Sequence, residues 1–288
     1  MRSKVLVTGG EGFIGTPVMA ELARRDYEPE SYGLAEGGVE NFRNLRQKVE
    51  GCEFVIHLAG VLGTHELGEN VQTIKHAVNV NVNGTVNVLE ACLQAGARYV
   101  GITMPQVFPS VYTATKVAAT RLATFYHRDY GVPVSHVRAF NAFGPGQAYG
   151  PGHPQKIVPT FVINALRGTP IPVWGDGDQG VDLVHTADLA TMLVDAAAFG
   201  DDDVFDGGTG EMHTVEEFAK LVIHLTDSSS EIGYVAYENV YEHGIEDMLH
   251  RIPSTEKIRA AIGWHPELTL EDILADVIAF ETARTVAS

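Results

Sequence analysis

The segment GGEGFIG, from Gly9 to Gly15, most constrains the fold, because it stands between two apolar runs of different period. Lys4–Thr8 (KVLVT) is rich in β-branched residues and predicts a buried strand, whereas residues 13–25 repeat with a helical period. Glycine is needed where the backbone turns tightly and approaches a pyrophosphate, and a helix N-terminus adds N–H groups and a positive dipole. The segment therefore predicts a strand–turn–helix unit that binds a dinucleotide.

Strand and helix patterns alternate through the first half of the chain. This alternation indicates parallel βαβ units. The predicted fold class is α/β, a Rossmann-type doubly wound parallel sheet with a smaller C-terminal α/β substrate lobe. The loop GPGQAYGPGHP at residues 144–154 marks a change of pattern. We place a cofactor-binding domain at residues 1–150, with segments returning near 181–207, and the smaller lobe at residues 151–288. The strands and helices we expect cover residues 4–8, 13–25, 27–34, 41–50, 53–58, 78–95, 98–103, 111–130, 132–140, 157–167, 188–199, 204–205, 214–225, 254–262 and 270–282.

Composition excludes several classes of protein. Lys and Arg number 20 against 37 Asp and Glu, and the net charge of −17 argues against sequence-independent binding of nucleic acid. Two cysteines, Cys52 and Cys92, do not make a disulfide framework, so a cytoplasmic location is expected. The N-terminal apolar run is too short for a signal peptide, and no run approaches the length of a membrane helix. The histidines show no metal-ligand spacing, so no metal is expected.

An acidic residue follows the glycine turn at the distance that selects between the two nicotinamide dinucleotides. Glu36 lies 21 residues after Gly15, near the end of the expected second strand. A carboxylate there binds the adenosine ribose hydroxyls. No lysine or arginine lies between Asp26 and Glu40 to hold a 2′-phosphate. The predicted cofactor is therefore NAD, not NADP.

Tyr112 and Lys116 form the main candidate for catalysis. They stand four residues apart in an expected helix and so share one face of it. A lysine ammonium beside a tyrosine favours the phenolate and lowers its pKa from about 10 toward the working pH. The pair therefore predicts a general base for a hydroxyl proton.

Three further motifs accompany the glycine turn and the Tyr–Lys pair. They are VIHLAG at residues 55–60, NVNGT at residues 81–85 and RAFNAFGP at residues 138–145. With these motifs the chain resembles, nearly from end to end, the extended short-chain dehydrogenases of the NAD-dependent epimerase/dehydratase type. Their combination is specific for the family and says little about the individual activity.

The resemblance implies a set of site residues. Asn141 contacts the substrate, and Arg251 binds its diphosphate with help from Lys156 or Arg167. The cofactor is bound by the glycine turn, the ends of the second and third strands, an asparagine and the Tyr–Lys pair. These residues are Gly9, Gly12, Phe13, Ile14, Gly15, Glu36, Leu58, Ala59, Gly60, Asn81, Tyr112 and Lys116.

Members of this family act on nucleotide-diphosphate sugars. By resemblance, Tyr112 takes a proton from a sugar hydroxyl while a hydride passes to NAD. The keto sugar is then reduced on its other face, or first loses water or carbon dioxide. Dehydratases and decarboxylases of the family carry an acidic residue where this chain has Gln106, and an amide is no general acid or base. The sequence therefore favours a sugar 4-epimerase over the other reactions.

The chain departs from the family at the third catalytic position. Met104 occupies the place of the usual serine or threonine. The adjacent Thr103 is predicted to supply the missing hydroxyl, on condition that the strand end bulges or that the alignment with the family shifts by one residue, because neighbouring strand residues point to opposite faces.

Two alternatives stay open beside the epimerase. One is a dehydratase, decarboxylase or oxidoreductase acting on a related sugar. The other is an NAD-binding protein with weakened catalysis, which Met104, Gln106 and Val181 favour, since Val181 replaces an arginine that contacts the substrate diphosphate in the family. The resemblance also implies a homodimer formed through the helices at residues 78–95 and 111–130.

Overall fold

The structure is a computed structural model that describes residues 2–62, 71–105, 110–149, 156–236 and 253–287. The chain forms two compact units, each built from three segments. The first unit contains Met1–Ala139, Thr186–Gly207 and Glu256–Trp264. The second unit contains Phe140–His185, Gly208–Thr255 and His265–Ser288.

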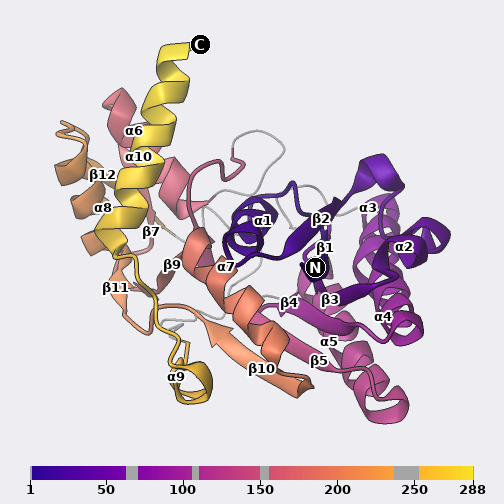
Figure 1. Cartoon of the computed structure of the whole chain (residues 1–288). Helices are drawn as coiled ribbons and strands as arrows, with labels where there is room; N and C mark the ends of the chain where they lie inside the picture. Colours follow the sequence, from indigo (N-terminus) through magenta and orange to yellow (C-terminus); the bar gives the residue numbers. More distant parts are fainter. Residues whose placement is uncertain (1, 63–70, 106–109, 150–155, 237–252, 288) are drawn as a thin grey trace. The chain divides into compact units, whose positions relative to one another are not determined.

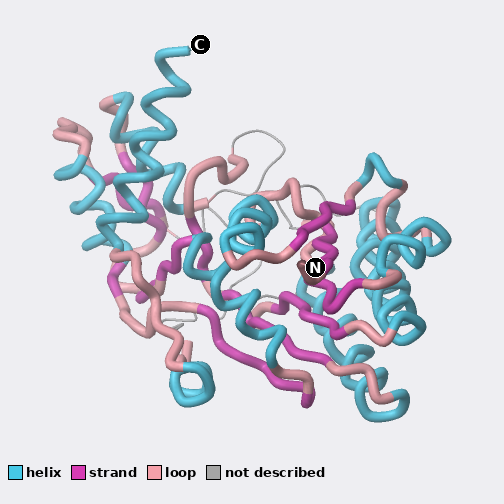
Figure 2. The backbone as a smooth tube through the Cα atoms, viewed as in Figure 1, coloured by secondary structure: helices cyan, strands magenta, loops and turns pink. Residues whose placement is uncertain are grey.

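A six-stranded parallel sheet forms the centre of the first unit, in the order β10-β5-β4-β3-β1-β2. Figure 2 shows its strands in magenta among cyan helices. The described sheet ends at β2 on one side, where the sequence between the glycine turn and β3 is short. The predicted α/β doubly wound sheet is confirmed. The strands are β1 Lys4–Thr8, β2 Glu28–Tyr32, β3 Cys52–His57, β4 Arg98–Thr103, β5 Val134–Ala139 and β10 Asp201–Gly207.

Helices cover both faces of this sheet. The strands present apolar side chains to both faces, and the helices bury these side chains. Leu6, Val55 and Tyr99 are in register on neighbouring strands and join one buried cluster with residues of α2, α4 and α5. Helices α1 and α7 pack against each other on the other face (Figure 1). The helices of the first unit are α1 Gly15–Arg24, α2 Phe42–Val49, α3 Val71–Ala77, α4 Gly84–Ala95, α5 Val111–Tyr130, α7 Thr186–Asp195 and α9 Glu256–Ile262, with short 3₁₀ turns at Leu34–Glu36 and Ala196–Ala198.

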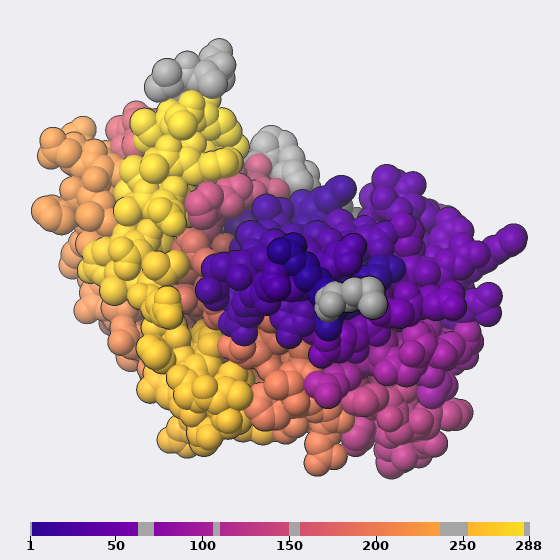
Figure 3. Space-filling model, in the orientation of Figure 1, coloured from indigo at the N-terminus to yellow at the C-terminus, as the bar shows by residue number. Residues whose placement is uncertain are grey.

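In the described part of the second unit, three helices pack on short strands. Its core includes Phe161 and Phe218, whose rings stack with centroids 5.2 Å apart. Helix α8 begins with a capping box, in which the Thr214 and Glu217 side chains each accept from the other residue's backbone N–H. One side of α10 is exposed and forms a yellow band in Figure 3. The helices are α6 Ile157–Arg167, α8 Val215–Leu225 and α10 Leu270–Ala287, and the paired strands are β6 Asn141–Phe143 with β9 Leu183–His185, β7 Ile171–Trp174 with β12 Ile232–Val235, and β8 Gly180–Val181 with β11 His213–Thr214.

The helix predicted at residues 78–95 is wrong in its start and its regularity. It continues back through α3, and a π-helical segment, Val78–Asn83, joins α3 to α4. Such a segment holds one extra residue per turn, which rotates the side chains that follow it, and it is frequent at functional sites. Asn81 lies within this segment and is buried.

Among the described residues, no helix is both long enough and apolar enough to cross a membrane.

Candidate functional site

The glycine turn after β1 is packed so closely that side chains have no room. Gly9 has φ +73°, and a Cβ there would lie 3.0 Å from the Ala59 N atom. A Cβ on Gly15 would lie 2.1 Å from the Gly9 O atom, well inside van der Waals contact. The turn therefore rests on the strand end that contains Leu58 and Ala59, as a dinucleotide site requires.

Helix α1 begins directly behind this turn with its N-terminus uncapped by side chains. Its N-cap residue, Ile14, gives no side-chain hydrogen bond, and its first turn holds no acidic residue. The N–H groups and the positive end of the dipole are thus available to an anion. Gly12, which accepts from the Thr16 N–H at 2.9 Å, and Phe13 complete the turn. These residues fit the diphosphate of NAD.

Glu36 lies just beyond β2, in the 3₁₀ turn Leu34–Glu36. Its Oε2 atom accepts from the Gly33 N–H at 2.8 Å, and the side chain is half-buried. The carboxylate therefore stands at the carboxyl end of β2, the edge at which open α/β sheets bind ligands. This placement agrees with a carboxylate that binds ribose, although one of its oxygens also caps its own turn.

Tyr112 and Lys116 lie in the first turns of α5. Ser110 caps this helix by accepting from the Thr113 N–H at 3.1 Å. Tyr112 is half-buried, and Lys116 is only 5% exposed. Burial raises the pKa of Tyr112 to about 12 and lowers the pKa of Lys116 to about 8, because both charged forms lose water. The pKa of Tyr112 therefore lies above its usual value of about 10, opposite to the direction expected from the Tyr–Lys pair, and burial is the cause.

Asn81 ties the π-helical segment to both the cofactor side and the start of α5. Its Oδ1 accepts from the Val61 N–H at 2.8 Å, and its Nδ2 donates to the Val61 O atom at 3.0 Å. The same Nδ2 donates to Thr115 Oγ1 at 3.0 Å. Thr115 Oγ1 in turn lies 2.8 Å from the Val111 O atom and 3.0 Å from the Tyr112 O atom. Asn81 thus holds the turn that carries Tyr112.

A second buried chain of hydrogen bonds, which the sequence did not predict, runs from β1 to the same asparagine. Thr8 Oγ1 lies 2.7 Å from His57 Nδ1, and His57 Nε2 lies 2.9 Å from Thr85 Oγ1. Thr85 Oγ1 donates to the Asn81 O atom at 2.7 Å, and Thr8 Oγ1 accepts from the Ala59 N–H at 3.2 Å. Polar residues inside two apolar strand runs, Thr8 and His57, are the sequence signal that points to this chain.

Two threonine hydroxyls, those of Thr103 and Thr113, lie near the end of β4. Thr103 bonds α5 at a residue after Lys116, whereas Thr113 precedes Lys116 on α5. Thr103 Oγ1 is bonded to Thr120 Oγ1 at 3.0 Å, eight residues beyond Tyr112, or about 12 Å along a helix. Thr113 Oγ1 lies 4.0 Å from the Met104 Sδ atom and 3.1 Å from Ser110 Oγ. Thr113, next to Tyr112 in sequence, is therefore the hydroxyl that faces the position of the missing one.

The predicted substrate residues belong to the second unit. Asn141 Nδ2 donates to the Asp182 O atom at 3.1 Å, and Lys156 is the residue before α6. Asp182 is fully buried and accepts from the Thr209 and Gly210 N–H groups. Arg251 and Gln106 lie outside the described residues.

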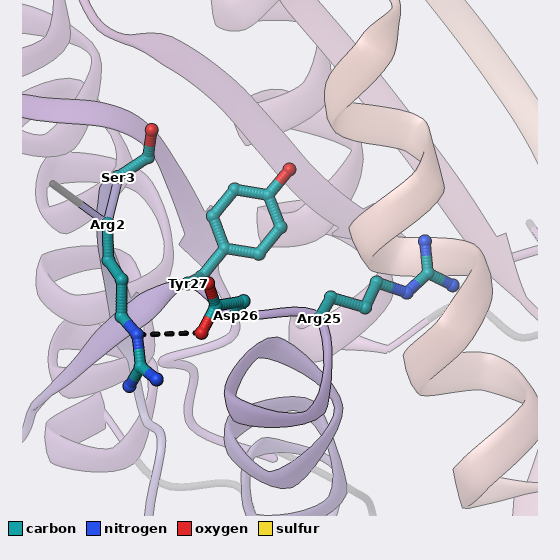
Figure 4. A pocket seen from close by; sticks show the side chains of 5 residues that line it. All are labelled: Arg2, Ser3, Arg25, Asp26 and Tyr27. Carbon is teal, nitrogen blue, oxygen red and sulfur yellow. Dashed lines mark ion pairs between the residues drawn. The ribbon is translucent and has the colours of Figure 1, made fainter.

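A shallow surface pocket lies at the other end of β1, near Arg2, Ser3 and Tyr27 (Figure 4). Arg2 pairs with Asp26 at 2.7 Å, but both side chains are more than half exposed, so the pair contributes little. Arg25, on the pocket's other side, pairs with Glu21 and Asp195. The pocket lies at the N-terminal end of β1, whereas the glycine turn follows the C-terminal end of this strand. We therefore assign no chemistry to the pocket.

Clusters of metal-binding side chains were sought as well. Within the ranges that the structure describes, no group of three or more His, Cys, Asp or Glu side chains is arranged to hold a metal ion.

Comparisons with known proteins show what this chain is similar to. The model of the NAD dependent epimerase/dehydratase family matches residues 5–205. A UDP-N-acetyl-alpha-D-glucosaminuronate decarboxylase of Bacillus cytotoxicus is 27% identical and covers 96% of this chain and 97% of its own. MoeE5, solved with UDP-glucose and NAD, is 26% identical with a TM-score of 0.80, over 99% of this chain and 100% of that one. A UDP-glucose 4-epimerase of Thermotoga maritima has a TM-score of 0.83 at 24% identity, over 98% and 99% of the two chains, which shows the shared fold.

Proposed function

The chain belongs to the NAD-dependent epimerase/dehydratase family, and on this premise we propose that it is a nucleotide-sugar 4-epimerase that works through a transient keto sugar. Membership confirms the predicted family and the predicted cofactor, NAD. We propose that the first unit holds the cofactor and the second holds the nucleotide-diphosphate sugar.

The arrangement of Tyr112, Lys116 and Asn81 carries this proposal. NAD held at the glycine turn would supply a reversible hydride acceptor for the sugar carbon. Tyr112 takes the hydroxyl proton in the same step and returns it after the keto sugar has presented its other face. A pKa raised to about 12 makes the Tyr112 phenolate a strong base for a sugar hydroxyl. Lys116 remains charged below a pKa of about 8 and favours that phenolate. Asn81 holds the turn through Thr115.

Epimerisation, dehydration and decarboxylation all begin with oxidation of the sugar, and Gln106 favours the first of them. Loss of water or carbon dioxide from the keto sugar is assisted by an acid–base group near the reacting carbon, and a glutamine side chain does not titrate. Epimerisation needs only rotation of the keto sugar and return of the hydride. Decarboxylation is the second candidate, because the Bacillus cytotoxicus relative carries that activity in its name.

A panel of UDP- and dTDP-sugars, incubated with the protein and NAD and followed by mass spectrometry and proton NMR, tests the proposal. Epimerisation gives a product of unchanged mass with a changed coupling pattern at C4. Loss of 44 or 18 mass units would instead establish a decarboxylase or a dehydratase (roughly the masses of carbon dioxide and water). Tight binding of NAD without any product would support the binding-protein alternative.

The third catalytic hydroxyl is tested by two matched substitutions, Thr103→Val and Thr113→Val. Each removes one hydroxyl at almost constant volume. Thr103 is the residue predicted from the sequence, whereas the contact with Met104 favours Thr113. We expect kcat to fall by at least tenfold in Thr113→Val and by less than threefold in Thr103→Val, both with unchanged melting temperatures (order-of-magnitude values for one hydroxyl hydrogen bond). The reverse order would assign the role to Thr103.

We also propose a homodimer formed through α3, α4 and α5. Apolar side chains are exposed on α3, on the π-helical segment and on α5, including Ile74, Val78, Phe125 and Tyr130. Such side chains gather at subunit interfaces. Sedimentation velocity at micromolar concentration should give a dimer, and Phe125→Asp should give a folded monomer. A wild-type monomer under these conditions would refute the proposal.

A further inference from the structure

The hydrogen bonds around His57 can be assigned a single direction, because each hydroxyl has only one proton to donate. Thr85 Oγ1 donates its proton to the Asn81 O atom at 2.7 Å. His57 Nε2, 2.9 Å from Thr85 Oγ1, must then be the donor in that contact. His57 is therefore the neutral tautomer protonated at Nε2, and its Nδ1 atom accepts the proton of Thr8 Oγ1 at 2.7 Å.

The surroundings of His57 agree with a neutral ring. His57 is 1% exposed, and burial, together with the Lys116 ammonium and His136, lowers its pKa to about 3. The Tyr99 ring packs beside it with centroids 5.9 Å apart. Protonation at Nδ1 would break the bond from Thr8, so the ring is fixed in one tautomer and one orientation.

This chain of hydrogen bonds connects the two parts of the proposed site, the glycine turn and the first turn of α5. At one end, Thr8 precedes Gly9 and accepts from the Ala59 N–H, so the chain reaches the glycine turn and the strand end beneath it. At the other end, Asn81 donates to Thr115, whose hydroxyl bonds the carbonyl groups of Val111 and Tyr112. His57 is the central member of this uninterrupted frame.

We propose that His57 is a positioning residue, which fixes the first turn of α5, and with it Tyr112, relative to the glycine turn. This inference rests on the proposed function for its catalytic meaning, but the frame itself is testable without turnover. A purely structural histidine would contribute packing alone, and the same sheet offers one for comparison.

His136 is that matched control. It lies on β5, is 2% exposed, packs against the same Tyr99 ring at 5.8 Å and has neither ring nitrogen hydrogen-bonded. Substituting leucine at either position removes a buried imidazole from the same sheet. Only His57→Leu breaks the frame, so the difference between the two variants isolates the effect of the hydrogen bonds from the effect of burial.

The first experiment is NMR of the protein labelled with ¹⁵N-histidine. The His57 ring should give the neutral Nε2–H pattern at pH 7 and keep it down to about pH 5. Amide exchange should then rise by at least tenfold in the first turn of α5, at Ala114 and Thr115, in His57→Leu and not in His136→Leu. An Nδ1–H tautomer, or equal exchange in both variants, would overturn the proposal.

The second experiment measures turnover. His57→Leu should lower kcat by at least tenfold with KM for the sugar within about threefold, and His136→Leu should leave kcat within about twofold. His57→Asn, which keeps an acceptor for Thr8, and His57→Gln, which keeps a donor for Thr85, should each recover part of the loss. Normal kcat in His57→Leu would refute the positioning role while leaving the epimerase intact. Absence of any sugar turnover in the wild type would refute the epimerase, and the NMR test would still decide the frame.

Discussion

Turnover of the nucleotide sugar is expected to fall by about 10²- to 10⁴-fold in Tyr112→Phe, the range that a positioned general base contributes. Phenylalanine keeps the ring and its packing but offers no oxygen to receive the sugar proton. Binding of NAD should change by less than threefold, because the glycine turn and Asn81 remain (an approximate bound from unchanged contacts). Steady-state kinetics and calorimetric titration with NAD measure the two effects separately.

The pH profile sharpens this test. With the pKa of Tyr112 raised to about 12, the phenolate fraction at neutral pH is small and grows as pH rises. Lys116 keeps its charge only below a pKa of about 8. The value of kcat/KM should therefore rise between pH 6 and pH 8 (approximate bounds from these pKa values) and level off above that range. Tyr130→Phe, an exposed tyrosine on the same helix, is the control. Wild-type turnover in Tyr112→Phe would refute the general-base role.

Gly15→Ala should abolish detectable NAD binding. A Cβ at this position would meet the Gly9 O atom at 2.1 Å, so the glycine turn must open. The turn would then lose the close backbone approach that a pyrophosphate needs. We expect at least a hundredfold loss of affinity, about 3 kcal/mol, by calorimetric titration.

Gly233→Ala is the matched control for this substitution. Gly233 lies on β12 in the second unit, and its nearest atoms would be 3.8 Å from an added Cβ. NAD affinity in this variant should equal that of the wild type. Circular dichroism and melting curves of both variants separate lost binding from lost folding. Wild-type affinity in Gly15→Ala would refute the role of the turn.

Local patterns in the sequence were sufficient for much of the fold. The spacing of apolar residues predicted β4, α5 and α6 with their observed bounds. The glycine turn was equally readable, because its tightest contact is between Gly15 and Gly9, which are close in the sequence. These features depend on interactions between residues close in the chain.

The features that the sequence did not yield depend on residues distant in the chain. Thr103 bonds Thr120, and His57 bonds both Thr8 and Thr85, only because strands β1, β3 and β4 meet helices α4 and α5 in the folded unit. The pKa of Tyr112 was wrongly expected to fall, because burial sums contributions from the whole surroundings. A motif of two residues, such as the Tyr–Lys pair, does not show how deeply either side chain is buried.

The two outer strands of the six-stranded sheet, β2 and β10, have a consequence for how the molecule associates. Their sequences are EPESY and DDDVFDG, and Pro29 leaves β2 one N–H short. Acidic side chains and a proline at a sheet border repel a second sheet that would otherwise extend it. These strand borders therefore resist fibril-like pairing with a second sheet, and any specific self-association is directed away from them and toward helical surfaces.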